Sequence, residues 1–252
     1  MNRDDELVRY TLTRPPTKSI GGRAPILIAE IGSSPAPGWW FERWCAAAKR
    51  AGATHIKAQM FKAEHFPSGE QAAKRPLEFP RERLPEFVRV AHENGLQAGV
   101  SVFDFDAVML AGAYCDFFKL AAREAGNRWL IDCCHYHESD KPIYRSVSRH
   151  KLDEFMLLRQ FTTLFAIQKY PASLMSSVWS LALWSRFAKC ELLPAWGWSS
   201  HTRGWLDCWL AALLGASVIE KHLRLSPDDA EAGWSLPMSE FRRMAERIGV
   251  IA

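Results

Sequence analysis

The sequence predicts an α/β protein built as a single (β/α)8 barrel, and two observations indicate this fold. Eight short apolar runs recur between residues 26 and 252, and helical patterns alternate with them. That span is close to the usual size of such a barrel, about 250 residues. No linker-like stretch separates a second domain, and a chain of 252 residues that is 48% hydrophobic can bury a substantial core.

Each element follows from its local pattern. The expected strands are ILIAEI (26–31), HIKAQM (55–60), AGVSVF (98–103), FFKLA (117–121), PIYRSV (142–147), TLFAIQ (163–168), LPAWGW (193–198) and SVIEKHL (217–223). The expected helices include 41–52, 80–95, 105–114, 176–188, 204–214 and 238–249. Ser239 is the expected N-cap of the last helix, and Gly249 its stop. Residues 1–25 form an N-terminal extension, in which VRYTLT (8–13) could add a strand at the barrel bottom.

Composition excludes several functional classes. The net charge is +4 and the basic residues are scattered, so nothing supports nucleic acid binding. The N-terminus is polar and no apolar run is long enough to span a bilayer, so we expect neither a signal peptide nor a membrane anchor. The six cysteines form no CxxC pair, which favours reduced, buried thiols and a cytoplasmic protein.

The barrel fold predicts where function lies, because active sites of such barrels form at the C-terminal ends of the strands. The chain places polar residues there in otherwise apolar runs: Glu30, Lys57, Gln59, Lys119, Glu124, Ser146, Gln168, Tyr170, Ser199, His201, Glu220 and His222. His201 and His222 close consecutive strands on either side of one helix. Adjacent parallel strands lie about 5 Å apart, so both imidazoles can reach one metal ion.

The buried charges have two interpretations. The structural one is that inward lysines form ion pairs with Glu30, Glu124 or Glu220. The functional one is that two lysines, two histidines and several serines at one rim bind a phosphate- or carboxylate-bearing ligand together with a metal.

Several motifs, in order along the chain, resemble the N-acetylneuraminate (sialic acid) synthase family. The resemblance begins at Ile26 and runs to the C-terminus. It rests on ILIAEIG (26–32), AKRAGATHIKAQMFKAE (48–64), FKLAAREAGN (118–127), KPIYRS (141–146), Tyr170-Pro171, GWSSHT (197–202) and GASVIEKH (215–222).

This resemblance implies a metal-dependent condensation of phosphoenolpyruvate with a sugar or small aldehyde. It makes His201 and His222 ligands of a divalent ion, usually Mn²⁺ with Mg²⁺ as an alternative, which polarises the aldehyde oxygen. Glu30 and Glu124 would act as hydrogen-bonding or acid–base groups near the acceptor and the attacking water. The residues implied to bind phosphoenolpyruvate are Lys57, Lys119, Ser146 and Ser199; Tyr170 would line the acceptor pocket.

The sequence departs from the family at several of these positions. Val102 stands where a hydroxyl is expected to meet the phosphate, and Ala122-Arg123 replaces Ser-Gly, with Arg123 offering a bidentate substitute. Gln168 replaces an asparagine, and Glu231 in AEAGWSL (230–236) is the nearest acid to a lost Pro-Asp-His loop. Ser34-Pro35 replaces Asn-His, Ser200 replaces an aspartate, and we expect no counterpart of the family's C-terminal antifreeze-like domain.

Three functions therefore remain open. The first is a divergent condensing enzyme of this type. The second is a barrel that keeps the metal and anion site but catalyses another reaction, as a lyase or aldolase. The third is a catalytically silent binding or assembly subunit with a tryptophan-rich rim. A homo-oligomer is compatible with each of them.

Overall fold

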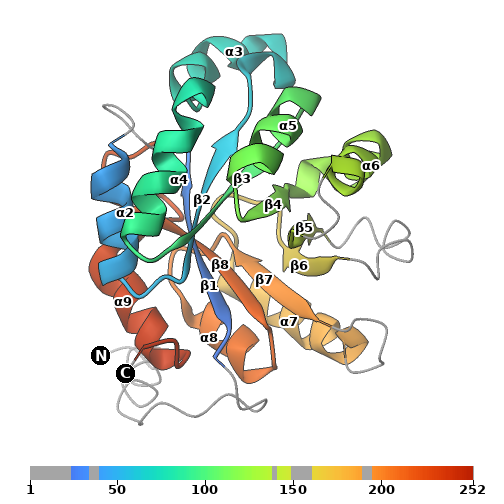
Figure 1. The fold of residues 1–252 in the computed structure, drawn as a ribbon. Coiled ribbons are helices and arrows are strands. Elements are labelled where there is room, and N and C mark those ends of the chain that lie inside the picture. The colour runs from blue at the N-terminus through green and yellow to red at the C-terminus, as the bar shows by residue number, and fades with distance from the viewer. Residues whose placement is uncertain (1–23, 34–39, 138–140, 149–160, 189–194, 252) are drawn as a thin grey trace.

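The computed structural model describes residues 24–33, 40–137, 141–148, 161–188 and 195–251, and these form a closed parallel barrel surrounded by helices (Figure 1). The strands follow one another in sequence order, and the first pairs with the eighth to close the barrel. The barrel strands are β1 (Ile26–Gly32), β2 (His55–Met60), β3 (Gln97–Val102), β4 (Phe117–Leu120), β5 (Ile143–Val147), β6 (Thr162–Ala166), β7 (Trp196–Ser200) and β8 (Val218–Arg224). The predicted fold class is confirmed.

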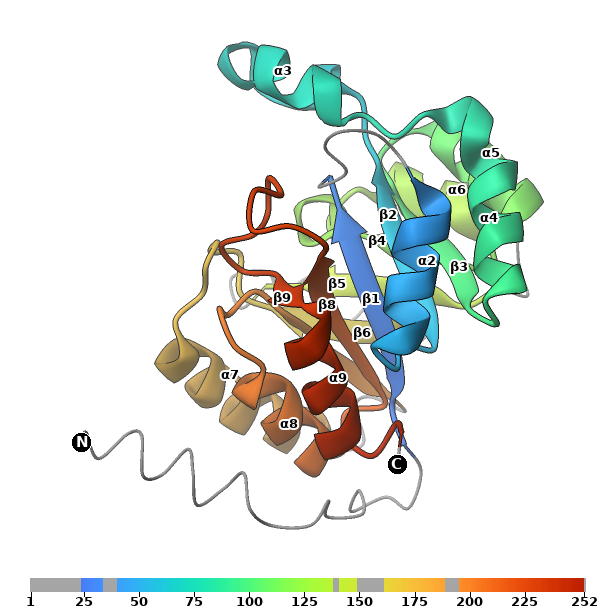
Figure 2. The ribbon, with the colours of Figure 1, turned by 90° about the vertical axis from the view of Figure 1, so that its left-hand side faces the viewer.

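The helices cover the outside of the barrel, except for one excursion after β2. They are α2 (Phe41–Arg50), α3 (Ser68–Lys74), α4 (Leu84–Glu93), α5 (Phe105–Tyr114), α6 (Arg128–His137), α7 (Leu174–Phe187), α8 (Leu206–Leu213) and α9 (Met238–Arg247). The short 3-10 helices are η1 (Ala63–His65), η2 (Arg75–Leu77), η3 (Arg81–Arg83) and η4 (Ala122–Glu124). Helix α3 buries none of its residues and projects beyond the C-terminal ends of the strands (Figure 2).

Local signals place most boundaries within a few residues of those expected. Helix α9 differs: it begins at Met238 with Pro237 as N-cap, so Ser239 lies in its first turn and the prediction of Ser239 as N-cap is wrong. The physical reason is that β9 (Leu236–Pro237) pairs with β8 and brings the chain directly into the helix. Gly249 does follow the end of α9 with a φ of 78°, as expected of a helix stop. The expected strand 8–13 lies outside the described residues.

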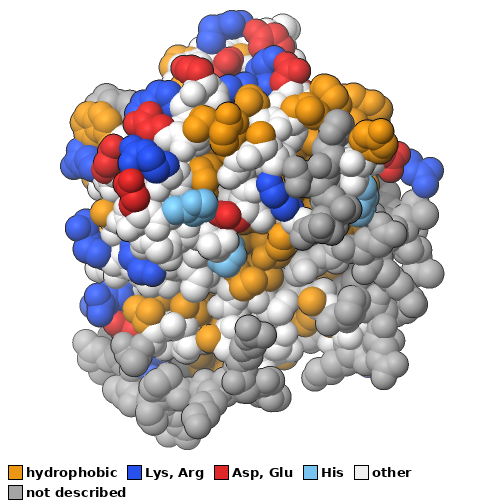
Figure 3. Space-filling view, in the orientation of Figure 1, with side chains coloured by type: hydrophobic (Ala, Val, Ile, Leu, Met, Phe, Trp, Pro, Cys, Tyr) orange, Lys and Arg blue, Asp and Glu red, His pale blue; other side chains and the backbone are white. Residues whose placement is uncertain are grey.

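Most thiols among the described residues are buried, as expected; Cys133 is partly exposed, and Cys190 lies outside the described residues. Cys45, Cys115, Cys134 and Cys208 are buried and free, and burial raises the pKa of Cys45 to about 12. Among the described residues, no helix is both long and apolar enough to cross a membrane. Hydrophobic side chains gather over α5 and α6 on the face shown in Figure 3. The exposed large hydrophobic residues of these two helices are Phe105, Met109, Tyr114, Trp129 and Tyr136.

The barrel interior is divided into an apolar layer and a polar layer. Inward side chains near the strand starts form a separate hydrophobic cluster, made up of Ile28, Phe117, Tyr144, Leu164 and Val218. Gly99 makes room for it, because a Cβ at that position would lie 2.4 Å from the Phe117 ring. The next inward residue on several strands is charged or hydroxylic. The apolar layer therefore supports a polar layer at the C-terminal ends.

We expect Gly99→Ala to lower the free energy of unfolding by about 1–3 kcal/mol, since the added methyl forces Phe117 out of its position. Gly69→Ala is the matched control, because a Cβ there meets nothing within 4 Å and the residue is helical. Urea denaturation of both variants is the measurement. Equal stabilities for the two variants would show that the layer is not tightly packed at Gly99.

Candidate functional site

A cavity of about 340 Å³ opens at the C-terminal ends of the strands, directly above the apolar layer. Ten of the eleven residues proposed from the sequence for catalysis, substrate or metal line it: Glu30, Lys57, Lys119, Arg123, Ser146, Gln168, Tyr170, Ser199, His201 and His222. The exception is Glu124, whose carboxylate contacts Arg123 (Nε–Oε1 3.2 Å) and Asn127 (Nδ2–Oε2 3.1 Å) instead. These side chains come together from β1, β2, β4, β5, β7 and β8 and from the loops after β4, β6 and β7.

Lys57 is the centre of the polar layer. The β1–β2 register sets Glu30 beside Lys57, and their side chains form a buried ion pair. The Lys57 ammonium also donates to Ser101 Oγ at 2.6 Å and lies 3.8 Å from Glu220 Oε2. The lysine is only 2% exposed. An inward ammonium at this depth needs these partners, because an unpaired buried charge is strongly unfavourable.

Lys119 repeats the arrangement on β4. Its ammonium donates to Ser146 Oγ at 2.8 Å and lies 3.4 Å from Glu220 Oε1. Ser199 Oγ donates to the same carboxylate oxygen at 2.7 Å, across the β7–β8 register. The other oxygen of Glu220, Oε2, is buried and accepts no hydrogen bond from the described residues. Two of the ion pairs that the structural interpretation predicts are therefore present. Glu30 pairs with Lys57, and the Glu220 carboxylate lies near both Lys57 and Lys119.

Burial and neighbouring charges have opposing effects on the pKa values of this layer. Burial is the main cause that lowers the pKa of Lys57 to about 7; Glu220 opposes this shift and nearby Lys119 adds to it. Burial by itself would raise the pKa of Glu220, but Lys119 and Lys57 outweigh it and hold that pKa well below its usual value. The layer thus contains an acid that stays ionised and a lysine whose charge is easily lost.

The two histidines face each other, with ring centroids 5.5 Å apart. His201 Nδ1 lies 2.9 Å from the carbonyl oxygen of Ile167, which favours a proton on Nδ1 and leaves Nε2 unprotonated. Burial, together with His222, lowers the pKa of His201 to about 3, so this ring is neutral at physiological pH. Neutral imidazole is the form that binds metals.

Glu231 holds the second histidine. Its Oε2 lies 2.7 Å from His222 Nδ1, and its Oε1 accepts a hydrogen bond from Ser33 Oγ at 2.8 Å. Burial opposes ionisation of Glu231, but His222 and Ser33 lower its pKa to about 2. A carboxylate behind a histidine fixes the ring orientation and raises its basicity toward a metal. Among the described residues, no group of three or more His, Cys, Asp or Glu side chains converges as a metal site; His201 and His222 are the two side chains that could hold an ion there.

An aromatic wall encloses the histidines. The Tyr170 ring centroid lies 4.4 Å from His201 and 5.3 Å from Trp234, and Trp234 lies 6.2 Å from His222. Burial and the charges of Glu231 and Glu220 raise the pKa of Tyr170 to about 12, which keeps its hydroxyl protonated. Trp234 Nε1 is buried and has no hydrogen-bond partner among the described residues. This N–H is available to an oxygen of a bound ligand.

The opposite rim is cationic. The Arg123 guanidinium stacks on Phe66, 4.6 Å from the ring centroid, and lies 5.7 Å from that of Phe103. It also donates to the carbonyl oxygen of His65, in the excursion after β2. Lys74 on α3 also lies over the Phe66 ring, 4.9 Å from its centroid. Both cations line the cavity.

Several site residues were not assigned a role from the sequence. Ser33, Ser101, Phe66 and Lys74 line the cavity, and only Ser101 carried a signal, as an inward position in period-2 alternation. Val102 is fully buried between the barrel and the helices and does not line the cavity, so it removes no contact from the lining. Ala122 does line it.

Sulfate should stabilise the protein by binding between Lys57 and Lys119, and the gain should fall as pH rises through about 7, because Lys57 then loses its charge. Sulfate keeps its own charge over this range, and the charged groups that act on Lys57 are Glu30, Glu220, Glu231 and Lys119. The measurement is the sulfate-dependent shift in Tm at pH 6 and pH 8.5, against chloride at equal ionic strength.

Lys57→Ala should lose the gain, whereas Lys49→Ala on the exposed face of α2 should keep it. A gain independent of pH, or one that survives in both Lys57→Ala and Lys119→Ala, would place the anion elsewhere.

Comparison with solved structures shows where this architecture recurs. The N-acetylneuraminic acid (sialic acid) synthetase of Leptospira borgpetersenii serovar Hardjo-bovis superposes with a TM-score of 0.82 at 19% identity, covering 90% of this chain and 84% of that chain. The spore coat polysaccharide biosynthesis protein of Bacillus subtilis gives 0.73 at 22% identity, over 93% and 69% of the two chains. The phospho-2-dehydro-3-deoxyheptonate aldolase of Thermotoga maritima gives 0.68 at 13%, over 90% and 68%.

At these identities the structural matches establish a shared fold. No curated protein matches the sequence. The sequence profile of the NeuB family, however, matches residues 44–252, which is well over half of the chain and includes Lys57, Lys119 and both histidines. The chain therefore belongs to the NeuB family.

Proposed function

We propose that the protein is a divergent sialic-acid-synthase-like enzyme that condenses phosphoenolpyruvate with a sugar or small aldehyde in a metal-dependent reaction. The observation that carries the proposal is the single cavity in which Lys57 and Lys119 lie below a facing pair of histidines. Family membership over residues 44–252 supports it. An anionic donor and a metal-bound acceptor require this combination of side chains.

The donor would bind against the two buried lysines. Ser146 and Ser199 already hydrogen-bond within this layer, and their hydroxyls can turn toward a carboxylate or phosphate. Glu220 occupies the position of the counter-charge, so the donor would take over part of its contacts with Lys57 and Lys119. Arg123 supplies a further cation at the rim in place of the hydroxyl lost at Ala122.

The histidine pair fits a divalent ion. His201 and His222 would hold it through their Nε2 atoms, because Nδ1 of each ring faces an oxygen of Ile167 or Glu231. Water and substrate would complete the coordination, as Mn²⁺ or Mg²⁺ both accept oxygen ligands. When bound, the ion would polarise the aldehyde oxygen of the acceptor.

Proton transfer would fall to Glu30 rather than to Glu124. Glu30 lines the cavity and pairs with Lys57, so the two can exchange a proton within one contact. In the overall reaction the methylene carbon of phosphoenolpyruvate bonds to the aldehyde carbon. The aldehyde oxygen takes up a proton and becomes a hydroxyl. Water adds to the carbon that carries the phosphate, and the bond from that carbon to the phosphate oxygen breaks, so that inorganic phosphate leaves and a ketone remains. Glu30 would accept the proton of that water.

The acceptor would bind beneath the aromatic wall. Tyr170, Gln168 and Trp234 line the cavity beside the histidines, and the unpaired Trp234 N–H can donate to a sugar oxygen. The cavity of about 340 Å³ must also hold the donor, which favours a short acceptor. We therefore propose that ordinary N-acetylneuraminate is not an efficient product.

The second candidate is a barrel that has kept the site but changed or lost the reaction. The specific observation in its favour is that Glu30 and Glu220 neutralise both lysines, so the layer is already satisfied without a ligand. A lyase, an aldolase or a silent binding subunit is compatible with that arrangement.

Mn²⁺ should bind with modest affinity, and the His201→Ala/His222→Ala double variant should weaken binding at least about tenfold, since two protein ligands are lost. Loss of the free Mn²⁺ signal in electron paramagnetic resonance measures the binding. His92→Ala is the control, because the His92 side chain is exposed on the outer face of α4. Equal Mn²⁺ binding by the double variant and the unaltered chain would show that His201 and His222 are not the metal ligands.

Phosphate should be released from phosphoenolpyruvate with Mn²⁺ and a short aldose, and faster than with N-acetylmannosamine, because the aromatic wall limits the acceptor's size. The assay measures inorganic phosphate across a panel of aldoses, with the double histidine variant as background. Robust turnover with N-acetylmannosamine alone would contradict the acceptor assignment. No release with any aldehyde, despite confirmed Mn²⁺ binding, would favour the second candidate.

A further inference from the structure

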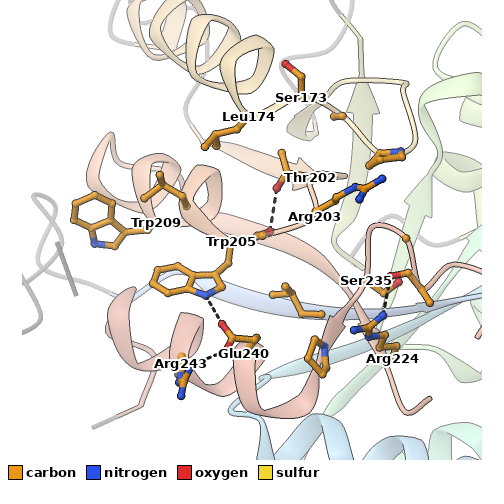
Figure 4. Close-up of a pocket in the computed structure, with 18 of the residues that line it drawn as sticks. Ser173, Leu174, Thr202, Arg203, Trp205, Trp209, Arg224, Ser235, Glu240 and Arg243 are labelled. Carbon is orange, nitrogen blue, oxygen red and sulfur yellow. Dashed lines mark hydrogen bonds and ion pairs between the residues drawn. The ribbon is translucent and has the colours of Figure 1, made fainter. Parts of the chain in front are cut away.

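A second cavity, of about 1090 Å³, lies outside the barrel between the C-terminal ends of β7 and β8 and helices α7, α8 and α9 (Figure 4). Trp205 and Trp209 of α8, with Leu174 at the start of α7, form its apolar side. Its volume is at the upper end of the range for small-molecule sites, about 300–1,000 Å³. It shares none of its lining residues with the barrel cavity.

Basic residues also line this cavity. Five basic residues line the cavity against a single acid among the described residues: Lys169, Arg203, Arg224, Arg243 and Arg247 against Glu240. That acid is already engaged, because Glu240 Oε1 accepts from Arg243 at 2.6 Å and Oε2 from Trp205 Nε1 at 3.1 Å. Figure 4 shows Arg203 and Arg224 on the opposite side from the two indoles. The cavity thus has the two indoles with the Arg243–Glu240 pair on one side, and Arg203 and Arg224 on the other.

We propose that this outer cavity binds a small anion that carries a flat apolar group, with the group against Trp205 and Trp209 and the phosphate or carboxylate against Arg203. Tryptophan faces suit a planar ring, and guanidinium groups suit a planar or tetrahedral oxyanion. Charge complementarity favours this occupant over a neutral or cationic one, since Lys169, Arg203 and Arg224 line the cavity in addition to the Arg243–Glu240 pair.

Three loops link this site to the barrel cavity, because each contributes neighbouring residues to the two cavities. Tyr170 faces the barrel cavity, while Pro171 faces the outer one. The same division separates His201 from Thr202 after β7, and Trp234 from Ser235 after β8. An occupant of the outer cavity would therefore brace the loops that carry the histidine and the aromatic wall. This inference does not depend on the proposed condensation reaction.

Calorimetry with phenyl phosphate, phenol and inorganic phosphate on the full chain tests the inference. Phenyl phosphate should bind at least about tenfold more tightly than either fragment, since both ends of the cavity contribute. Arg203→Glu and Trp209→Leu should each weaken it about tenfold or more. The matched controls, Arg128→Glu on α6 and Trp179→Leu, 70% exposed on α7, should not change it, because neither residue lines the cavity.

Hydrogen exchange of the unaltered chain locates the ligand without any variant. Phenyl phosphate should slow amide exchange within 202–206 and 232–237. Protection confined to 57–61 and 119–124 would place the ligand in the barrel cavity and overturn the proposal. Phenol binding as tightly as phenyl phosphate would also overturn it, and would indicate an apolar face for a peptide or protein.

Discussion

The pairing of two buried lysines with two buried glutamates holds the upper barrel together, and the site depends on it. Lys57 and Lys119 are each 2% exposed, Glu30 is 1% and Glu220 is 3%. Removing one partner of such a pair costs about 3–5 kcal/mol, because it leaves an uncompensated charge in a region of low polarity. The apolar layer below cannot supply compensation, so the four groups stabilise one another and the serines complete their hydrogen bonds.

This mutual neutralisation also defines what a ligand must do. An anion that binds between the lysines has to replace carboxylate contacts rather than fill an empty positive site. Glu220 is the group best placed to yield, because it serves both lysines and one of its oxygens lacks a hydrogen bond. The histidine pair needs no such exchange, since His201 is held neutral by burial. The anion would therefore have to displace existing carboxylate contacts, whereas the metal would bind at the histidines without displacing any.

The fold could be predicted because strand alternation and helix stops are local signals. HIKAQM at 55–60 is a strand as expected, and its alternation correctly put Lys57 and Gln59 on one face, since both line the cavity. The helix 105–114 and the stop at Gly249 follow from short-range pattern in the same way. The start of α9 could not be predicted in this way, because the pairing of β9 with β8 sets it.

The site was predictable only where its residues lie on strands. Arg123 stacks on Phe66 across 57 positions of sequence, and no periodic pattern joins the two. Trp234 and Glu231 come from an irregular loop after β8, whose path over the histidines only the three-dimensional structure shows. Val102 looked important from its place in a motif, but it faces the helices.

A crystal of the protein soaked with Mn²⁺ and phosphoenolpyruvate tests the central claim most directly. Anomalous scattering should give a peak between His201 and His222, with phosphate or carboxylate density against Lys57 and Lys119 and a displaced Glu220 side chain. An intact set of lysine–glutamate pairs at saturating ligand, with no anomalous peak at the histidines, would contradict it and show that the polar layer only stabilises the barrel.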